Sequence, residues 1–252
     1  MEYHAQREHV VSWLHEYLCC SKKSGFVLGL SGGIDSLTLA LMGNEAASRS
    51  GGTLLAIITK MDYTYDYVDN SYAQKAVKMF GLSNVFIDLS EAFDALRRSL
   101  PSPFHPAAFT NLKARLRSSV LYYYANNQNL LVLGTVNRGE FMIGYFPKNA
   151  SAGDILAMAH LSKRDIRGIA ETYGVPEDMR ERKASGCIFA ETAEEEWGFT
   201  EAELDQMCDH VIARQPPDGI AEAKWKRFIE MHAASGHKRA FYPLIGEARS
   251  NK

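Results

Sequence analysis

The stretch Ser31-Gly32-Gly33-Ile34-Asp35-Ser36 combines hydroxyl groups, a carboxylate and two adjacent glycines, and these residue types together could bind a charged ligand. An apolar run at residues 26–29 precedes it and predicts a buried parallel strand. Another apolar run, from residue 36 to about residue 47, predicts a helix. The glycines let the backbone approach a ligand, and the helix start offers unpaired N–H groups and the positive end of a dipole. We therefore expect an anion-binding loop here.

The spacing of this loop narrows the kind of anion. A Walker loop requires a lysine that is absent here, and Gly29, Gly32 and Gly33 do not have the spacing of the dinucleotide fingerprint. The string instead resembles the pyrophosphate-binding loop of the ATP-pyrophosphatase families, which split ATP into AMP and pyrophosphate. A carboxylate such as Asp35 beside a phosphate is unfavourable unless a cation such as Mg²⁺ lies between them. The alternative is a plain turn between a strand and a helix.

Composition excludes several classes of protein. The chain has 252 residues, of which 46% are hydrophobic and 23% charged, with a formal net charge of −2, which suits one α/β domain over residues 1–252. Without a basic excess we expect no nucleic-acid partner, and without a run of about 18 apolar residues we expect no membrane span. Residues 1–7 are polar, so we see no signal peptide. Cys19, Cys20, Cys187 and Cys208 form no Cys-x-x-Cys pair, so we expect neither a zinc site nor a disulfide framework, and a cytoplasmic protein.

Strands alternate with helices along the chain, which predicts a right-handed, doubly wound parallel sheet with helices on both faces. Strands are expected at 26–29, 53–59, 84–88 and 129–134. Helices are expected at 9–20, 36–47, 70–80, 90–100, 111–125, 162–173, 200–212 and 221–235, with irregular chain at 101–106 and over most of 181–199. The expected N-caps include Ser90, Ser162 and Thr200, the last with Glu203 in a near capping box.

Further motifs, spread over about residues 8–240, resemble those of the ammonia-dependent NAD⁺ synthetase family. They are Asn111-Leu-Lys-Ala-Arg-Leu-Arg117 with Leu121-Tyr-Tyr-Tyr-Ala125, Leu133-Gly-Thr-Val-Asn-Arg-Gly-Glu140, Gly144-Tyr-Phe-Pro-Lys148, Leu161-Ser-Lys163, Thr192-Ala-Glu-Glu-Glu-Trp-Gly198 and His237-Lys-Arg239. The resemblance implies a fold like that of the adenine nucleotide alpha hydrolases, and a homodimer.

The activity implied by the resemblance is amide formation. In that family the carboxylate of deamido-NAD⁺ attacks the α-phosphate of ATP, pyrophosphate leaves, and ammonia displaces AMP to give NAD⁺. Adenylation joins two anions, so it needs cations and dipoles around the transferred group. The resemblance therefore implies ATP, Mg²⁺ and small-molecule substrates as the ligands of this protein.

Site residues follow from the same resemblance, position by position. The ATP-binding residues would be Gly29, Leu30, Ser31, Gly32, Gly33, Ile34, Asp35, Ser36, Thr135, Lys163 and Ser185, with Asp35 and Lys163 catalytic. Asp35 and Glu140 would hold the metal ion. The acid substrate would contact Arg115, Lys148, Asp154, His237 and Lys238. The alternatives are an exposed acid at a helix start for Glu140, a surface position for Lys163, a surface or ion-paired position for Arg115, and a disordered tail for the His237–Lys238 pair.

Three segments depart from the family pattern. The segment from Asn149 to Asp154 is one residue shorter than usual and lacks an internal acid, Ser185-Gly186-Cys187-Ile188 has a thiol where the family has an Asp, and residues 60–70 lack the usual adenine-recognition signature. Two of these changes lie on the acid and amine side. An amide synthetase acting on another small carboxylic acid or amine therefore stays open as an alternative, and so does a non-catalytic nucleotide-binding regulator. A tRNA-thiolating enzyme is disfavoured, because it would need a basic RNA surface.

Overall fold

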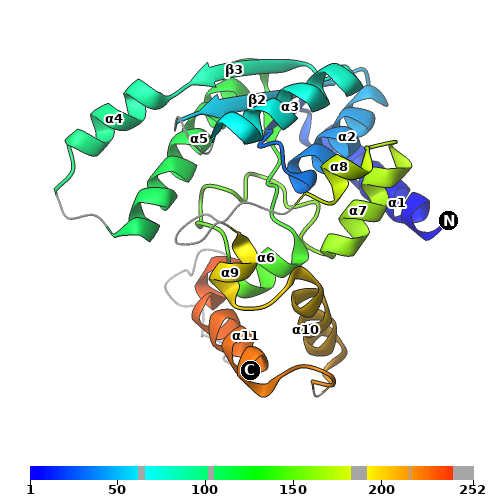
Figure 1. Ribbon diagram of the computed structural model, residues 1–252. Helices are drawn as coiled ribbons and strands as arrows, with labels where there is room; N and C mark the ends of the chain where they lie inside the picture. Colours follow the sequence, from blue (N-terminus) through cyan, green and yellow to red (C-terminus); the bar gives the residue numbers. More distant parts are fainter. Residues whose placement is uncertain (62–65, 102–104, 183–191, 216, 241–252) are drawn as a thin grey trace, which may run out of the picture.

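In the computed structural model, which describes residues 1–61, 66–101, 105–182, 192–215 and 217–240, four parallel strands form one sheet (Figure 1). In chain order they are β1 (Gly25–Gly29), β2 (Thr53–Lys60), β3 (Asn84–Asp88) and β4 (Leu130–Val132). The order across the sheet is β3-β2-β1-β4. The chain therefore builds outward from β1 in one direction and then returns to its other side, as in a doubly wound sheet. Ligands bind at such a switch point, outside the carboxyl ends of the strands.

Helices connect these strands and complete the chain. Their bounds are α1 (Glu2–Ser21), α2 (Ile34–Ser48), α3 (Asp66–Phe80), α4 (Ser90–Arg98), α5 (Pro106–Gln128), α6 (Arg138–Ile143), α7 (Lys163–Thr172), α8 (Glu177–Arg180), α9 (Ala193–Trp197), α10 (Glu201–Ala213), α11 (Glu222–Ala234) and α12 (Gly236–Arg239). None of the helices in the described part of the chain has the length and hydropathy that a membrane span requires.

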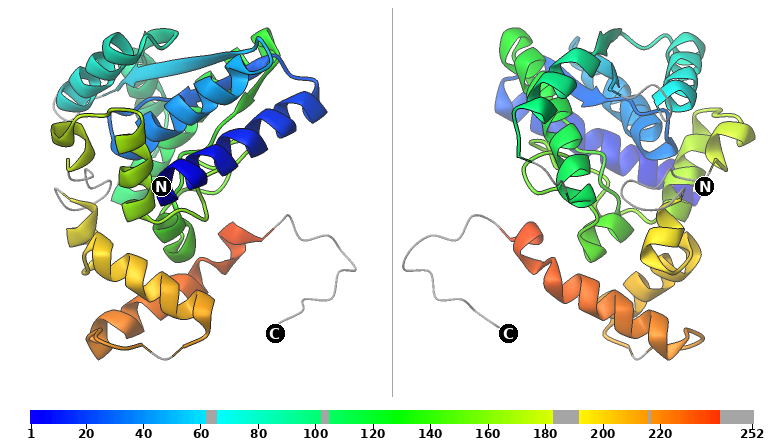
Figure 2. Two further views of the ribbon diagram at one scale, coloured as in Figure 1. Left: turned by 90° about the vertical axis from the view of Figure 1, so that its right-hand side faces the viewer. Right: turned by 60° about the vertical axis from the view of Figure 1, so that its left-hand side comes forward.

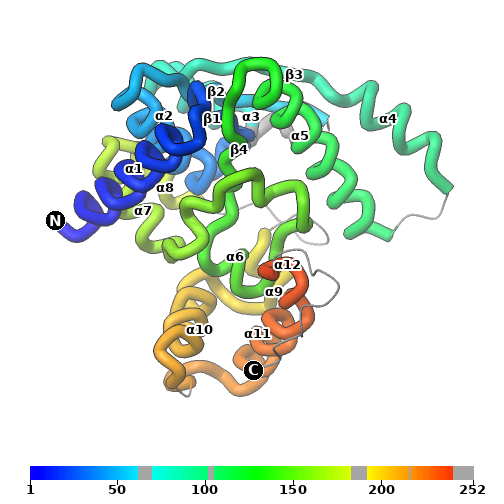
Figure 3. The backbone as a smooth tube through the Cα atoms, turned by 180° about the vertical axis from the view of Figure 1, so that it is seen from behind, coloured from blue at the N-terminus to red at the C-terminus, as the bar shows by residue number. Residues whose placement is uncertain are grey.

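Both faces of the sheet are covered, as the sequence predicts. Phe26 and Leu28 of β1 belong to a core built with α1, α2 and α7, whereas Val27 belongs to a core with α5. Helices α1 and α2 lie on one side of the sheet and α5 on the other (Figure 3). This alternation follows from the two-residue period of a strand. The continuous apolar run in β1 therefore reflects burial on both sides, which confirms the predicted α/β class.

A separate helical cluster lies beside the sheet layers, at the bottom of Figure 1 and of both views in Figure 2. Its core contains Trp197, Leu204 and Phe228, which come from α9, α10 and α11, and Ile143 from α6. The sequence predicts two of these helices, but not that they share a core apart from the sheet.

Three predicted helices start at least four residues earlier than the sequence suggested, and one of them is α3, which begins at Asp66 rather than at residue 70. Helix α1 begins at Glu2 rather than at residue 9, because its first turns pack polar side chains against α7, which an apolar stripe does not reveal. Helix α5 begins at Pro106, where the prediction placed irregular chain. The side chain of His105 accepts a hydrogen bond from the N–H of Ala107, and Pro106 fits the first helical position because the N–H it lacks would have no partner there.

Other predicted boundaries were also wrong. Strand β4 ends at Val132, and Leu133 instead forms isolated bridges with Gly153 and Ile155. Leu89, not Ser90, caps α4. Helix α9 lies in a segment predicted to be mostly irregular, where a capping box between Thr192 and Glu195 supports one short helix. The capping residues of α7 and α10, Ser162 and Thr200, are as predicted.

Candidate active site

The predicted anion loop joins β1 to α2 and holds its own shape by hydrogen bonds. Gly32 has a φ of 81°, a conformation that glycine adopts readily. The hydroxyl oxygens of Ser31 and Ser36 lie 3.1 Å apart, and the Ser36 hydroxyl donates to the carbonyl of Gly33 at 2.9 Å. Because the cap residue Gly33 has no side chain, it supplies no acceptor for the first N–H groups of α2. These groups are therefore oriented for an anionic ligand.

Asp35, in the first turn of α2, is joined to two distant parts of the chain. Its Oδ2 atom lies 2.7 Å from Nζ of Lys163, the first residue of α7, and accepts a hydrogen bond from the side-chain amide of Asn137 at 3.2 Å. The side chains of Asp35 and Lys163 are only 16% and 9% exposed. Among the described residues, Oδ1 of Asp35 is buried and has no hydrogen-bond partner. The alternative of a surface position for Lys163 is therefore wrong.

Glu140 lies close to this ion pair, at the start of α6. Its N–H donates to Oδ1 of Asn137 and its Oε2 accepts from the N–H of Asn137, so that the two residues form a capping box. Burial, and then the negative charge of Asp35, raise the pKa of the Glu140 carboxyl above its usual range. The alternative interpretation of Glu140 was an exposed acid at a helix start. It was correct about the helix start but wrong about exposure, because this side chain is partly buried.

The pair of carboxylates fits a hard divalent cation. Asp35 offers an unpartnered buried oxygen, and Glu140 is near enough for the charge of Asp35 to affect its pKa. In the described part of the chain no group of three or more His, Cys, Asp or Glu side chains forms a metal site. Mg²⁺ commonly binds through one or two carboxylates together with substrate phosphates and water, and this donor set matches that pattern.

Glu201, which the sequence analysis missed, contacts the other side of Lys163. Its Oε1 lies 3.7 Å from Nζ of Lys163, and its Oε2 lies 2.5 Å from the guanidinium of Arg167. Burial alone would lower the pKa of Lys163, but the charge of Asp35 and then those of Glu201 and Glu140 outweigh it and raise this pKa. Lys163 is therefore charged. In sequence, Glu201 is only one more acid at a helix start, so nothing distinguished it.

A small pocket adjoins these groups, between the sheet layers and the helical cluster. Asp205 of α10 accepts hydrogen bonds from the N–H groups of Lys163 and Arg164, at 3.3 and 3.4 Å, and so ties the helical cluster to the start of α7. The pocket is lined by Asn137, Gly139, Glu140, Lys163, Trp197, Glu201, Leu204 and Asp205.

The predicted acid-binding residues gather into a cationic group, with one exception. Nζ of Lys148 donates to the carbonyl of His237 at 2.6 Å, and Nζ of Lys238 donates to the carbonyl of Gly144 at the same distance. Burial, and then the charge of Arg115, lower the pKa of Lys238, so the two cations are within electrostatic range of each other although α5 and α12 are far apart in sequence. The positive segment 236–239 is thus a short helix held by hydrogen bonds.

Asp154 is the exception. Its Oδ1 accepts from the hydroxyl of Tyr122 at 3.0 Å, and its Oδ2 accepts from the N–H of Val132 at 2.9 Å. Both carboxylate oxygens are thus bound to α5 and β4, and the contacts fix the segment that follows the shortened loop. Thr135, beyond β4, is partly buried. Ser185 and Cys187 lie outside the described residues.

Two arginines that the sequence analysis did not assign also contact the site elements. Arg182 donates to the carbonyl of Gly32 at 3.1 Å, and its guanidinium lies 4.7 Å from the ring centroid of Tyr72. Arg239 donates to the carbonyl of Met142 at 2.8 Å, at the C-terminal end of α6, where a positive charge is favourable. Both act on backbone carbonyls, which sequence spacing does not indicate.

Comparisons with known proteins agree with this geometry. The sequence profile of the family described as NAD synthase matches residues 6–241. The NH(3)-dependent NAD(+) synthetase of Finegoldia magna is 37% identical over 96% of this chain and 95% of its own length, and that of Aeropyrum pernix is 34% identical over 100% and 92%.

Solved structures share the fold over nearly the whole chain. An NMN synthetase from Francisella tularensis has a TM-score of 0.86 at 28% identity, covering 98% of this chain and 99% of its own. An NH3-dependent NAD synthetase from Campylobacter jejuni has a TM-score of 0.77 at 22% identity, covering 97% and 100%. With the phosphate loop, the ion pair of Asp35 and the full-length match in agreement, the chain belongs to the NAD synthase family.

Proposed function

We propose that this protein is an ATP-dependent amide ligase that makes NAD⁺ from deamido-NAD⁺, ammonia and ATP. The substrate carboxylate attacks the α-phosphate of ATP, pyrophosphate leaves, and ammonia then displaces AMP from the acyl-adenylate. The observation that carries the proposal is the contact between Asp35 and Lys163 at the phosphate loop, with Glu140 beside it. These charges come from three separate elements and meet where a nucleotide phosphate would bind.

The roles of the loop residues follow from charge and position. The N–H groups at the start of α2 and the hydroxyls of Ser31 and Ser36 would bind phosphate oxygens, with the backbone of 29–34 forming the cradle. Lys163, which is charged, would turn from Asp35 to the phosphates and stabilise the negative charge that develops there. Asp35 and Glu140 would hold Mg²⁺, which supplies further positive charge when bound. Thr135 and Ser185 complete the proposed ATP site.

The acid substrate would bind at the cationic group. Arg115, Lys148, His237 and Lys238 supply positive charge or donors suited to the phosphates of a nucleotide, and the proposed role of Asp154 is to hold the substrate from the β4 side. Arg115 is exposed, so it is accessible to a ligand. A regulator that only binds a nucleotide would not need two carboxylates for a metal ion, which favours catalysis.

A mass-spectrometric assay tests the activity. The protein is incubated with ATP, Mg²⁺, ammonium and deamido-NAD⁺, and NAD⁺ and AMP are quantified. We expect equal amounts of both products, and neither from Asp35→Asn, which keeps the shape of the side chain but removes its charge. Asp94→Asn, on exposed α4, is the matched control and should be as active as the wild type. Folded wild-type protein that binds ATP without forming AMP would overturn the proposal in favour of a regulator.

A second acid deserves the same assay. The NMN synthetase from Francisella tularensis has both a higher TM-score and a higher identity to this chain than the NAD synthetase from Campylobacter jejuni. The corresponding substrate for this chain would be nicotinic acid mononucleotide. Deamido-NAD⁺ and the mononucleotide at equal concentration, with limiting ATP, give the ratio of the two kcat/KM values directly. A ratio in favour of the mononucleotide would replace the first substrate and leave the mechanism unchanged.

We further propose a homodimer in the cytoplasm. Trp13 and Tyr17 on α1 are 43% and 41% exposed and lie against each other, and Tyr123 on α5 is 64% exposed. Exposed aromatic residues of this kind are enriched in the centres of protein interfaces. Light scattering coupled to size exclusion should give twice the mass of the 28.1 kDa chain, and a monomer at micromolar concentration would contradict it.

A further inference from the structure

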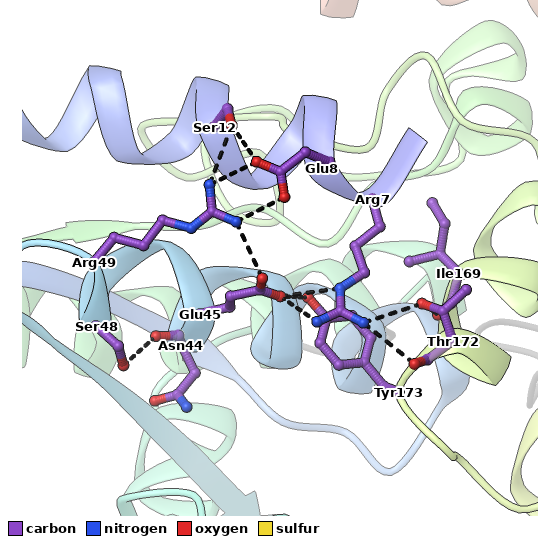
Figure 4. A network of polar contacts seen from close by, with 10 residues as sticks. All are labelled: Arg7, Glu8, Ser12, Asn44, Glu45, Ser48, Arg49, Ile169, Thr172 and Tyr173. Carbon is purple, nitrogen blue, oxygen red and sulfur yellow. Dashed lines mark hydrogen bonds and ion pairs between the residues drawn. The ribbon is translucent and has the colours of Figure 1, made fainter. Parts of the chain in front are cut away.

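A polar network joins α1, α2 and α7 at the far end of the two helices that carry Asp35 and Lys163 (Figure 4). At its centre, Oε2 of Glu45 accepts from the guanidinium of Arg7 at 2.8 Å and from the hydroxyl of Tyr173 at 2.5 Å. Arg7 also donates to the carbonyl of Thr172 at 3.2 Å, and its Cζ lies 3.6 Å from the ring centroid of Tyr173. Three elements therefore meet on one carboxylate.

The first turns of α1 contact α7 along its whole length. Gln6 donates to Asp165 near the start of α7 at 3.3 Å, and Arg7 reaches Thr172 at its end. Between them, the ring of Tyr3 lies on Gly168, where a Cβ atom would come within 2.5 Å of it. Residues 3, 6 and 7 share one face of α1, since they are three and four positions apart. This face holds α7 against α2.

The network and the phosphate site lie at opposite ends of the same helices. Asp35 and Lys163 are in the first turns of α2 and α7, whereas Glu45 and Thr172 are nine or ten residues further on, which is about 14 Å along a helix. A tilt of α7 by a few degrees about its far end would move Lys163 by on the order of 1 Å, a displacement that can cost a factor of about 100 in rate.

We propose that Arg7, Glu45 and Tyr173 are positioning residues, which hold α7 so that Lys163 meets the ATP phosphates. This rests on the proposed function, in which Lys163 leaves Asp35 for a phosphate. The ion pair then no longer joins α2 to α7, and the contacts at the far end keep the direction of α7. Burial, and then the interactions with Glu45, raise the pKa of Tyr173, so its hydroxyl remains a donor at neutral pH.

The network also offers a matched control. Glu8 contacts Arg49 and Ser12 on the α1–α2 side, at 2.8 Å in each case, and within the described part of the chain its hydrogen bonds and ion pairs do not reach α7. Tyr173→Phe removes the hydroxyl but keeps the ring under Arg7, whereas Glu8→Gln weakens a neighbouring pair of the same network. Both variants weaken the network, but only Tyr173→Phe removes a hydrogen bond that joins the end of α7 to α2. A purely structural role of the network would affect them alike.

The test measures the chemical reactivity of Lys163 as well as the rate of AMP formation. Each protein, with and without a non-hydrolysable ATP analogue and Mg²⁺, is treated with an amine-reactive reagent, and labelling of Lys163 is followed by mass spectrometry. We expect Tyr173→Phe to be labelled several-fold faster than the wild type, and its kcat for AMP formation to fall about tenfold with the KM for ATP within twofold. Glu8→Gln should match the wild type in the labelling rate of Lys163, in kcat and in the KM for ATP.

Arg7→Lys is the second variant, because it keeps the charge but loses the stacked, two-pronged contact, and it should behave like Tyr173→Phe. Equal labelling and equal kcat in Tyr173→Phe and Glu8→Gln would overturn the positioning role. A wild type that forms no AMP would instead reject the proposed function. Labelling of Lys163 would still decide the positioning question, because it does not depend on turnover.

Discussion

Asp35 and Lys163 neutralise each other in a place that is mostly shielded from water. A buried ion pair contributes little net stability compared with apolar residues, but the loss of one partner leaves an uncompensated charge. Loss of Lys163 would leave the charge of Asp35 close to the charges of Glu140 and of Glu201, which lies on the other side of the lysine. The pair is therefore a strong constraint on both residues, whatever their roles toward ATP.

This constraint predicts the outcome of a double-mutant cycle. Lys163→Met should lower the free energy of unfolding by about 3 kcal/mol, because it leaves carboxylates without a counter-charge. Adding Asp35→Asn to Lys163→Met should restore part of that loss, since one of the unpaired charges is gone. Urea unfolding of the wild type, both single variants and the double variant measures this. Simple additivity of the two single effects would show that the pair is not coupled.

At the level of residues, the sequence predicted some parts of the site better than others. The spacing from Ser31 to Ser36 was enough to predict a phosphate loop, because glycines, hydroxyls and a helix start act locally. Lys163 was named only through the resemblance to a family, since its contact with Asp35 spans 128 positions. Glu201 and Arg182 escaped notice, because an acid or an arginine near a helix end has no distinctive local pattern.

Among the predicted helices, α1 has the start that lies furthest from its prediction. The hydrophobic pattern predicted a helix only over residues 9–20, where Val10, Val11, Leu14 and Leu18 are buried against the sheet core. In the preceding turns, Tyr3, Gln6 and Arg7 face α7, whereas most of the other side chains are exposed. A helix whose contacts are made by Gln6 and Arg7 looks like a solvated segment to any rule that counts apolar residues. Helix α9 was missed for another reason: it has only five residues, held by its capping box and the buried Trp197, too few to show a periodic apolar pattern.

The contact of α1 with α2 should make stability depend on pH. Burial would raise the pKa of Glu45, but hydrogen bonds from Tyr173 and Arg7 outweigh it and lower this pKa. The unfolded chain therefore takes up the proton at a higher pH than the folded protein. The contribution of Glu45 is complete above its usual pKa of about 4.3 and is lost as pH falls below that value toward the lowered pKa.

Thermal melts from pH 7 to pH 3 test this dependence. The difference in Tm between the wild type and Glu45→Gln should be largest at neutral pH and should shrink below about pH 4.3. Glu16→Gln, which changes an exposed residue of α1, is the control and should show a small difference at every pH. A constant difference for Glu45→Gln would mean that its charge is not what stabilises the three-helix contact.

At the level of the whole molecule, the sheet with its two faces and the helical cluster have separate cores, and the site lies where they meet. The alternation of strands and helices predicted the sheet, because a strand that is buried on both faces of a sheet consists of a continuous apolar run. It did not predict the helical cluster, whose core draws on α6 from the middle of the chain and on α9 to α11. Long-range packing of short helices leaves little periodic signal.

Because the two cores are separate, a cavity made in one core should have little effect on the stability of the other. Phe228 is fully buried in the helical cluster, so Phe228→Ala should lower the free energy of unfolding by about 3–5 kcal/mol and destabilise mainly this cluster. Hydrogen exchange should become faster in α10 and α11 but stay slow in β1, which is at the centre of the sheet. Ile229→Ala, next in sequence and 38% exposed, is the control and should leave both unchanged. Uniformly faster exchange would show that the two cores unfold together.

The ion pair at the phosphate loop also bears on how a catalytic cycle ends. In the proposed reaction, Lys163 and Asp35 part when ATP binds, and each gains a partner in the nucleotide complex. When pyrophosphate departs, each charge finds the other again within the protein, and ions from solution are not needed to neutralise the emptied loop. The re-formed contact offsets part of the lost phosphate binding, and the protein thereby assists the release of its own product.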